Sequence, residues 1–183
     1  MGGELQSGAL YVVATPIGNL EDMTFRGVRI LREVDRIACE DTRITRRLCD
    51  HFGVDTPLMR HEAHNEAAST DGILALLEQG EAIALVSDAG TPCINDPGQR
   101  LIGATITAGY PVIPIPGASS LIVALSASGL PTERFIFHGF LPKKERARSA
   151  CAWFRTHGGE PPVAAGKKPW GFESWQTRRF LGQ

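Results

Sequence analysis

The sequence lacks any hydrophobic run near the roughly 20 residues that a membrane-spanning helix requires. Its N-terminus also lacks the basic segment and apolar stretch of a secretory signal. Cysteine is scarce, and Cys39, Cys49, Cys93 and Cys151 form no C-x-x-C pair, which argues against a zinc site or a disulfide framework. We therefore expect reduced thiols, no membrane contact and a cytoplasmic location.

Several common catalytic motifs are also missing. There is no G-x-x-x-x-G-K-[ST], which disfavours a P-loop ATPase, and no G-x-G-x-x-G, which weakens a standard dinucleotide fold. No G-x-S-x-G elbow of a hydrolase occurs. His61 and His64 form H-E-x-H rather than the H-E-x-x-H of a helical zinc site, so the spacing leaves open an ordinary loop pair or a ligand pair.

Charge is distributed unevenly along the chain. Residues 1–140 hold 10 basic and 17 acidic residues, whereas residues 141–183 hold 9 basic and 3 acidic residues and all three tryptophans. This change predicts a boundary near Pro142, with an α/β domain over residues 8–141 and a basic linker and irregular tail over residues 142–183.

Short apolar segments alternate with helical patterns. We expect strands at 9–14, 36–39, 82–86, 111–115 and 135–140, and an irregular segment at 54–64. Helices are expected after Thr24, with Val28, Leu31 and Val34 on one face, and then up to Phe52, from Asn65 to Gly80, at 99–108 and at 121–128. The pattern predicts an α/β fold with a mostly parallel sheet of about five strands flanked by helices.

Ligands of such sheets bind outside the carboxyl ends of the strands. The rule selects four loops rich in Pro, Gly and small polar residues, at 15–19, 40–43, 87–98 and 116–120. Asp88 either binds a ligand or stabilises a turn, and Ser119 and Ser120 either cap a helix or contact a ligand. The arginines that follow Asp41 are either a solvated helix face or phosphate contacts.

The motifs in these loops resemble one family. VATPIGNLEDMTFRG (13–27), ACEDTR (38–43), the segment 61–66, LVSDAGTPCINDPG (85–98), PIPGASS (114–120), ALSASGLP (124–131) and GFLP (139–142) are similar to the bacterial small-subunit ribosomal RNA methyltransferase I family, of the tetrapyrrole methylase superfamily. The resemblance implies methylation, by S-adenosylmethionine, of the ribose 2′-hydroxyl of a cytidine in 16S rRNA of the small ribosomal subunit. It also implies a homodimer, and the methyl transfer that it implies requires no metal.

The resemblance further implies roles for individual residues. The cofactor-binding residues would be Pro16, Ile17, Val86, Ser87, Asp88, Thr91, Ser119 and Ser120. Candidates for a general base or a hydrogen-bond acceptor are Glu40, Asp41, His61 and His64. Phosphate contacts to rRNA would come from Arg43, Arg46, Arg47, Lys143 and Lys144.

Family members continue into a second α/β domain that completes the donor pocket, whereas this chain stops resembling them near residue 147. A truncated or frameshifted second domain would explain such a tail. Two alternatives to the rRNA methyltransferase are a precorrin-type tetrapyrrole methylase and a catalytically defective first-domain fragment.

Overall fold

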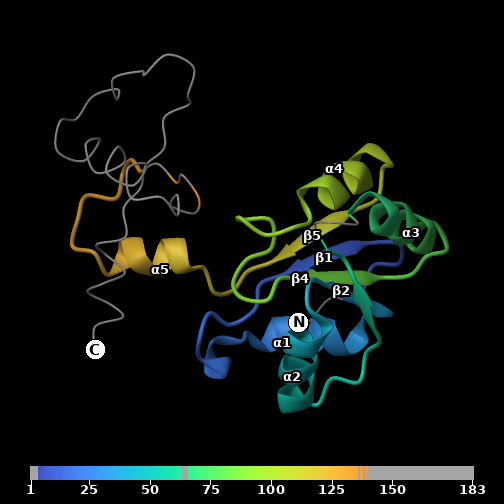
Figure 1. Ribbon diagram of the computed structural model, residues 1–183, viewed down its shortest axis with the longest axis horizontal. Coiled ribbons are helices and arrows are strands. Elements are labelled where there is room, and N and C mark those ends of the chain that lie inside the picture. Colours follow the sequence, from blue (N-terminus) through green and yellow to red (C-terminus); the bar gives the residue numbers. More distant parts are fainter. Residues whose placement is uncertain (1–3, 63–65, 136, 138, 140–183) are drawn as a thin grey trace. The chain divides into compact units, whose positions relative to one another are not determined.

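The computed structural model describes residues 4–62, 66–135, 137 and 139, and its contacts divide the chain into two compact units, 1–120 and 121–183. The first unit is built in the order β1 (Leu10–Val13), η1 (Leu20–Asp22), α1 (Phe25–Glu33), β2 (Arg36–Cys39), α2 (Thr42–Phe52), β3 (Leu58–Arg60), α3 (Glu66–Glu78), β4 (Ile83–Val86), α4 (Gln99–Thr107) and β5 (Val112–Ile115) (Figure 1). Helix α5 (Ser120–Ser126) begins at the boundary between the units. The predicted boundary at 141/142 lies outside the described residues.

The five strands form one parallel sheet in the order β3-β2-β4-β1-β5. All four residues of β4 are buried, which explains why this strand is continuously apolar rather than alternating. The expected α/β class and parallel sheet are thereby confirmed.

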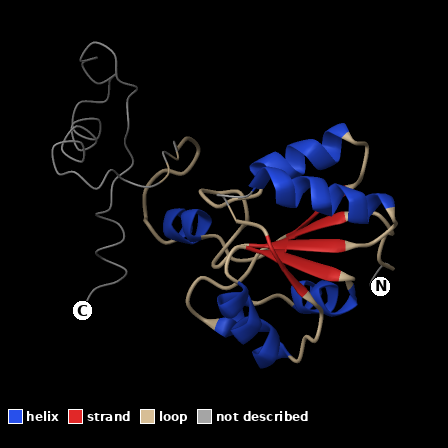
Figure 2. Ribbon diagram, turned by 45° about the vertical axis from the view of Figure 1, so that its right-hand side comes forward, coloured by secondary structure: helices blue, strands red, loops and turns tan. Residues whose placement is uncertain are grey.

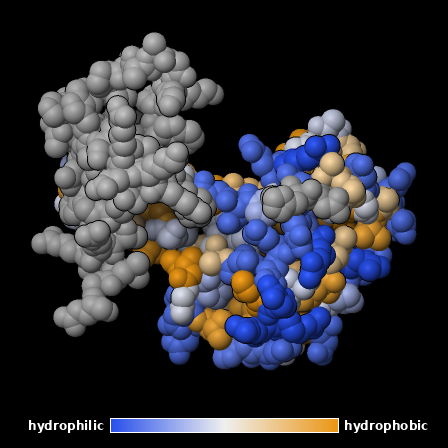
Figure 3. Space-filling view, viewed as in Figure 1, coloured by the Kyte–Doolittle hydropathy of each residue, from blue (hydrophilic) through white to orange (hydrophobic). Residues whose placement is uncertain are grey.

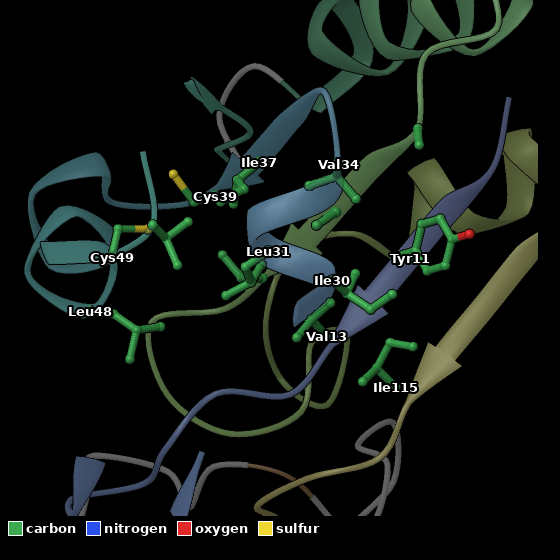
Figure 4. Packing of buried hydrophobic residues seen from close by; sticks show 14 of the residues in the cluster. Tyr11, Val13, Ile30, Leu31, Val34, Ile37, Cys39, Leu48, Cys49 and Ile115 are labelled. Carbon is green, nitrogen blue, oxygen red and sulfur yellow. The ribbon is translucent and has the colours of Figure 1, made fainter. Parts of the chain in front are cut away.

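Alternate residues of each strand enter two separate cores, with α1 and α2 on one face and α3 and α4 on the other (Figure 2). On the α1/α2 face, Tyr11 and Val13 pack with Ile30, Leu31 and Ile37 (Figure 4). On the α3/α4 face, the neighbouring strand residues pack with residues of both helices: Leu10, Ile83, Leu85, Ile73, Leu77 and Leu101. Burial on both faces fixes the register, because a shift of one residue would exchange the two cores.

Local signals set the ends of the first two helices. Thr24 accepts a hydrogen bond from Gly27 N at 3.0 Å and caps α1, as expected. Asp41 caps α2, and Gly53 ends it with a φ of 61°. The buried face of α1 includes Ile30 and Leu31, whereas the expected Val28 is only half-buried.

Two expectations about strands are wrong. The segment expected to be irregular contains β3, which pairs with β2 at the edge of the sheet. Conversely, Phe135, Phe137 and Gly139 are not in a strand, and both phenylalanines are more than 40% exposed; residues 136, 138 and 140 lie outside the described residues. A strand needs a hydrogen-bonding neighbour as well as an apolar sequence, and the 58–60 segment has this neighbour in β2.

The described cysteines Cys39, Cys49 and Cys93 are free thiols, which confirms the expectation for these three; Cys151 lies outside the described residues. Within the part of the chain that the structure describes, no helix is both long and apolar enough to cross a membrane.

Candidate functional site

The connectivity of the sheet creates a point where the chain leaves two adjacent strands in opposite directions. Strands β1 and β4 lie side by side, yet β1 leads to α1 on one face and β4 leads to α4 on the other. Parallel α/β sheets bind ligands in the crevice that such a reversal opens at the carboxyl ends of the strands. The loops after β1 and β4 both lie at this edge.

These two loops are joined directly through their backbones. Thr15 and Gly90 exchange two hydrogen bonds, Thr15 N to Gly90 O at 2.9 Å and Gly90 N to Thr15 O at 3.1 Å. Thr15 Oγ1 also donates to Ser87 O at 3.0 Å, and Ser87 Oγ donates to Gly90 O at 3.1 Å. Pro16 and Ile17 are therefore held beside Ser87 and its neighbours.

The loop after β5 approaches the same place. Thr91 Oγ1 donates to Ala118 O at 3.1 Å. Gly90 has a φ of +84°, and a Cβ atom there would lie 3.3 Å from Ile17 Cγ2 and 3.9 Å from Ala118 O. Three loops that are far apart in the sequence thus converge around Gly90, where the positive φ favours glycine and a Cβ atom would press on the Ile17 side chain.

The residues expected to bind the cofactor lie at the ends of these strands. Val86 is the last residue of β4, and Pro16 and Ser87 are buried beside it, whereas Ile17, Asp88, Thr91 and Ser119 are half-buried. Ser120 is exposed and is the first residue of α5. The expected residues therefore share one edge of the sheet, with most of their polar contacts made through loop backbones.

Carboxylates from three loops lie near each other at this edge. Asp88 Oδ1 accepts a hydrogen bond from Asp41 N at 3.2 Å, which joins the β4 loop to the start of α2. Burial and the negative charges of Asp88, Asp96, Glu62 and Asp41 raise the pKa of Glu40. Burial and Asp88 also raise the pKa of Asp96.

Asp41 behaves in the opposite way. Its carboxylate accepts hydrogen bonds from Arg43 Nη2 at 2.7 Å and from Arg43 Nε at 3.1 Å, and it also caps α2 through Arg43 N. These bonds hold the pKa of Asp41 well below its usual range. Asp41 and Arg43 are therefore both engaged in an ion pair.

His61 is fully buried behind this edge. Its Nδ1 is 2.8 Å from Ser69 Oγ, and its Nε2 lies 3.9 Å from Glu66 Oε1 without a hydrogen-bond partner. Burial lowers the pKa of His61, so the neutral imidazole is favoured. His64 lies outside the described residues, so the expected pairing of the two histidines is not described.

A pocket of about 280 Å³ opens between the β1 loop, the β4 loop and α2. Its apolar walls are Pro16, Leu20, Ile44 and Leu48. Its polar lining comes from Thr15, Thr45, Ser87 and Asp88, together with Arg47. The sequence indicates Pro16, Ser87, Asp88 and Arg47 but not Leu20, Ile44, Thr45 and Leu48. The last three depend on how α2 packs, and Leu20 depends on how the short helix η1 folds back after β1.

The basic residues expected to contact RNA are distributed around the same helix. Arg43, Arg46 and Arg47 are all exposed on α2, and Arg47 lines the pocket. Lys143 and Lys144 lie outside the described residues. Within the described ranges, no group of three or more His, Cys, Asp or Glu side chains is arranged to hold a metal ion.

Curated relatives match the same part of the chain. A protein named Ribosomal RNA small subunit methyltransferase I from Synechocystis sp. is 57% identical over 141 residues, which are 77% of this chain and 50% of the relative. Proteins of the same name from Halalkalibacterium halodurans and Pseudomonas aeruginosa are 53% and 51% identical, over 49% and 51% of their own lengths. The chain spans about half the length of these relatives.

A solved structure has a related fold. The uroporphyrin-III-C-methyltransferase from Thermus thermophilus superposes with a TM-score of 0.52 and 26% identity, over 68% of this chain and 53% of that chain. A conserved hypothetical protein from Aeropyrum pernix shares the fold with a TM-score of 0.58 at 20% identity, over 71% of this chain and 46% of that chain.

A family model also matches most of the sequence. The match to the Tetrapyrrole (Corrin/Porphyrin) Methylases covers residues 9–172, so it includes the whole sheet and runs past Pro142. It extends further than the curated relatives, which match 141 to 144 residues, and than the structural matches. The chain belongs to the tetrapyrrole methylase family.

Proposed function

We propose that this chain carries the donor-binding half of an S-adenosylmethionine-dependent methyltransferase, whose acceptor is the ribose 2′-hydroxyl of a cytidine in 16S rRNA of the small ribosomal subunit. The observation that carries the proposal is the meeting of the β1, β4 and β5 loops around Gly90. Relatives more than 50% identical over this part of the chain are named as rRNA methyltransferases.

The convergence around Gly90 fits a sulfonium nucleotide. Because loop backbones approach closely there, main-chain groups can contact the donor without a glycine-rich fingerprint. S-adenosylmethionine supplies a methyl group that is already activated for displacement. The chain's own contribution is to bind and orient, through Pro16, Ile17, Val86, Ser87, Asp88, Thr91, Ser119 and Ser120.

Among the candidates, we assign Glu40 as the acceptor for the hydroxyl proton. Its raised pKa makes it a better proton acceptor than an ordinary carboxylate. Asp41 is less suited, because its ion pair with Arg43 holds its pKa low. His61 is buried without exposure to solvent, and we assign it a structural role beside Ser69. His64 remains a candidate from sequence.

The rRNA contacts belong to the same edge of the molecule. Exposed Arg46 and Arg47 follow Asp41 on α2, so phosphates bound there would lie near the carboxylate end of the site. We propose Arg43, Lys143 and Lys144 as further contacts on sequence grounds. A homodimer, implied by the family resemblance, and a cytoplasmic location, expected from the sequence, complete the proposal.

The test measures binding and transfer separately. Calorimetry with S-adenosylhomocysteine reports donor binding, and transfer of a labelled methyl group to undermethylated small subunits reports the acceptor. Transfer to a precorrin instead would favour a tetrapyrrole methylase, which the likeness to a uroporphyrin methyltransferase keeps as the second candidate. A folded chain that binds neither the donor nor the subunit would contradict the proposal.

A further inference from the structure

His61 is a buried titratable residue that the proposed function does not use chemically. Hydrophilic residues predominate on the face of the first unit shown in Figure 3, whereas His61 is 0% exposed. It follows β3 directly, and its backbone N donates to Cys39 O at 2.8 Å at the end of β2. The ring therefore lies at the carboxyl edge of the sheet, where the loops of the candidate site begin.

The hydrogen bonds of His61 determine which ring nitrogen carries the proton. Nδ1 lies 2.8 Å from Ser69 Oγ, and the Ser69 hydroxyl donates to Glu66 O at 3.2 Å. Because a hydroxyl has a single proton, Ser69 Oγ accepts from Nδ1–H, and Nε2 of the neutral ring is left as an acceptor. Nε2 is buried and has no hydrogen-bond partner among the residues that the structure describes.

The carboxylate of Glu66 faces this unpartnered nitrogen. Glu66 Oε1 lies 3.9 Å from His61 Nε2, so two acceptors face each other while the ring is neutral. Protonation of Nε2 would place a donor and a positive charge opposite the carboxylate. Charge-assisted bonds of this kind are about 2.7–2.9 Å long, so the two atoms would have to approach by about 1 Å to form one.

The same oxygen of Glu66 also holds the end of the β4 loop. Oε1 accepts a hydrogen bond from Gly98 N at 3.1 Å. Gly98 is the N-cap of α4 with a φ of 120°, and it makes no side-chain cap of its own. A Cβ atom there would lie 2.8 Å from Leu85 Cδ2, so the cap has to come from another element. One carboxylate oxygen thus faces both a buried imidazole and the amide that ends the loop.

The segment that ends at Gly98 depends on this contact. The hydrogen bonds between the β1 and β4 loops fix its start, and the bond to Glu66 fixes its end. Between these points Cys93 and Asn95 have φ values of 70° and 69°, conformations that neighbouring contacts must maintain. Thr91, an expected donor contact, lies in the same segment. Release of Gly98 N would let these conformations relax and would move this part of the donor site.

Electrostatics couples His61 to Glu66. Burial lowers the pKa of His61, and the charge of Glu66 opposes that effect. The ring is therefore neutral at pH 7 and gains its proton below the ordinary value of 6.5. Because the neutral form is the one that the fold favours, its contribution to stability is lost as the pH falls from 6.5 through the folded-state pKa.

Titratable groups on the neighbouring elements have other partners. After β3, Glu62 pairs with Arg60 at 3.0 Å. On β2, burial raises the pKa of Cys39, and on the β4 loop, burial and the charge of Asp96 raise the pKa of Cys93 to about 11. Both thiols therefore stay neutral between pH 5 and pH 8, the range in which His61 changes its charge.

We propose that His61 and Glu66 form a pH-sensitive switch, in which protonation of His61 Nε2 draws the Glu66 carboxylate away from Gly98 N and loosens the 87–98 loop. Its effect on the donor rests on the proposed function, because this loop carries Asp88 and Thr91. His61 is then a positioning residue that acts through Glu66 without touching the donor. Donor binding is strongest while the ring is neutral.

An NMR titration of the full chain between pH 8 and pH 5 tests the connection. The Gly98 amide signal is expected to move with the same midpoint as the ring signals of His61, below pH 6.5, because the loss of its hydrogen bond changes its chemical shift. The internal control is the Ala82 amide, which donates to Asp35 Oδ2 at 2.7 Å before β4, at the opposite end of the strands. Its signal should not follow the His61 midpoint.

Two variants separate the switch from a purely structural role. Glu66→Gln keeps an oxygen acceptor for Gly98 but removes the charge, so the Gly98 signal should stop following His61 and the His61 midpoint should fall. His61→Asn keeps an N–H donor near Ser69 without a titratable group, and it should abolish the Gly98 transition. The matched control is Glu78→Gln, an exposed glutamate on the same helix as Glu66, which should leave the transition unchanged.

Calorimetry with S-adenosylhomocysteine at pH 7.5 and pH 5.5 measures the effect on donor binding. The affinity of the parent should fall by about two- to tenfold more than that of Glu66→Gln, the range expected for one hydrogen bond. Glu40 and Asp96, whose pKa values are also raised, are present in both chains, so their titration cancels in this comparison.

The outcomes separate this inference from the proposed function. If the Gly98 signal does not follow His61, or still follows it in Glu66→Gln, the switch is wrong, while donor binding at pH 7.5 still supports the proposed function. An equal loss of affinity in the parent and in Glu66→Gln also overturns the inferred effect on the donor. If Gly98 follows His61 but S-adenosylhomocysteine binds at neither pH, the switch stands and the proposed function fails.

Discussion

Glu40 and Asp41 are neighbours in the sequence whose pKa values move in opposite directions. Asp41 has Arg43 as a partner, whereas Glu40 faces the charges of Asp88, Asp96 and Glu62. Ionised Asp41 thus stabilises the fold, whereas ionisation of Glu40 destabilises it. Such opposed carboxylates are typical of sites in which one group holds structure and the other handles a proton.

Replacing Glu40 with glutamine is expected to stabilise the folded chain at pH 7. Because the folded-state pKa of Glu40 is raised above its ordinary 4.5, ionisation costs stability as the pH rises through the folded value. Glu40→Gln should therefore raise the urea midpoint at pH 7, and the difference from the parent should vanish near pH 4, where Glu40 is protonated.

Glu78→Gln, an exposed glutamate at the end of α3, is the control and should change the urea midpoint little at either pH. An equal rise for Glu40→Gln at pH 4 and pH 7 would show that the effect is not electrostatic. In the transfer of a labelled methyl group to undermethylated small subunits, Glu40→Gln should lower the rate.

Gly90→Ala tests the point where the three loops meet. Alanine at a φ of +84° costs about 1 kcal/mol. Its Cβ would also lie 3.3 Å from Ile17 Cγ2, so the side chain of this expected donor contact must shift by a few tenths of an ångström. Thermal unfolding should show the lower stability, and S-adenosylhomocysteine titration should show weakened donor binding.

The matched control is Gly103→Ala inside α4. A Cβ at Gly103 meets nothing within 4 Å and its φ is not positive, so alanine should stabilise that helix by about 0.5–1 kcal/mol and leave donor binding unchanged. If Gly90→Ala leaves the affinity for S-adenosylhomocysteine unchanged, the converged loops around Gly90 are not part of the donor site.

The sequence predicts residues of this site unequally. Pro16, Ser87 and Asp88 follow strands directly, so the rule for parallel sheets is enough to bring them together. Thr45 and Leu48 face the pocket only because of the rotation at which α2 packs, which no local pattern specifies. His61 stands in a polar segment of the sequence, and its complete burial results from the packing of α3 against the sheet edge.

At the scale of elements, Glu66 at the start of α3 secures the loop that carries Asp88. Its Oε1 accepts a hydrogen bond from Gly98 N at 3.1 Å, and Gly98 has no side chain with which to cap α4 itself. The loop before Gly98 contains Cys93 and Asn95 at φ values of 70° and 69°, conformations that neighbouring contacts must maintain. Helices α3 and α4 are thus joined at the end of the loop that carries Asp88, which stabilises this loop of the candidate site.

Glu66→Ala should release this connection. The loss of a cap is expected to cost about 1 kcal/mol, and hydrogen exchange should become faster at the first amides of α4 and in the 87–98 loop. Glu66→Gln keeps an oxygen acceptor and should restore most of the protection. If the amides of the 87–98 loop exchange at the same rate in Glu66→Ala as in the parent, the Glu66–Gly98 hydrogen bond does not stabilise this loop.

Elements were predictable where the local pattern and the long-range packing agree. Strands β1, β2, β4 and β5 are short apolar runs closed by Pro, Gly or polar residues, and each lies within one residue of its expected ends. Strand β3 (Leu58–Arg60) has only three residues and no buried position, so its sequence does not distinguish it from a loop. The 135–140 segment has the reverse property, because its pattern is apolar but its described residues, 135, 137 and 139, are not in a strand.

At the scale of the whole molecule, the order of the strands determines where the site lies. The sheet places β4 between β2 and β1, and this insertion creates the reversal at β1 and β4. Sequence order alone allows several arrangements of five parallel strands, because the choice depends on contacts between distant segments. The sequence therefore predicted which loops lie at the carboxyl edge of the sheet but not which of them are adjacent.

The part of the relatives that this chain matches leads to the last prediction. The relatives are about twice as long as the matched part, and the family resemblance implies that a second domain supplies the other wall of the donor pocket. Since pockets bury about 70–90% of a small ligand, one wall provides only part of that burial. We expect calorimetry to give this chain an affinity for S-adenosylhomocysteine at least about tenfold below that of a full-length relative, a difference of about 1.4 kcal/mol. Circular dichroism should show that the chain is folded, and Gly90→Ala should weaken the remaining binding further. An affinity equal to that of the relative would mean that the converged loops suffice for donor binding.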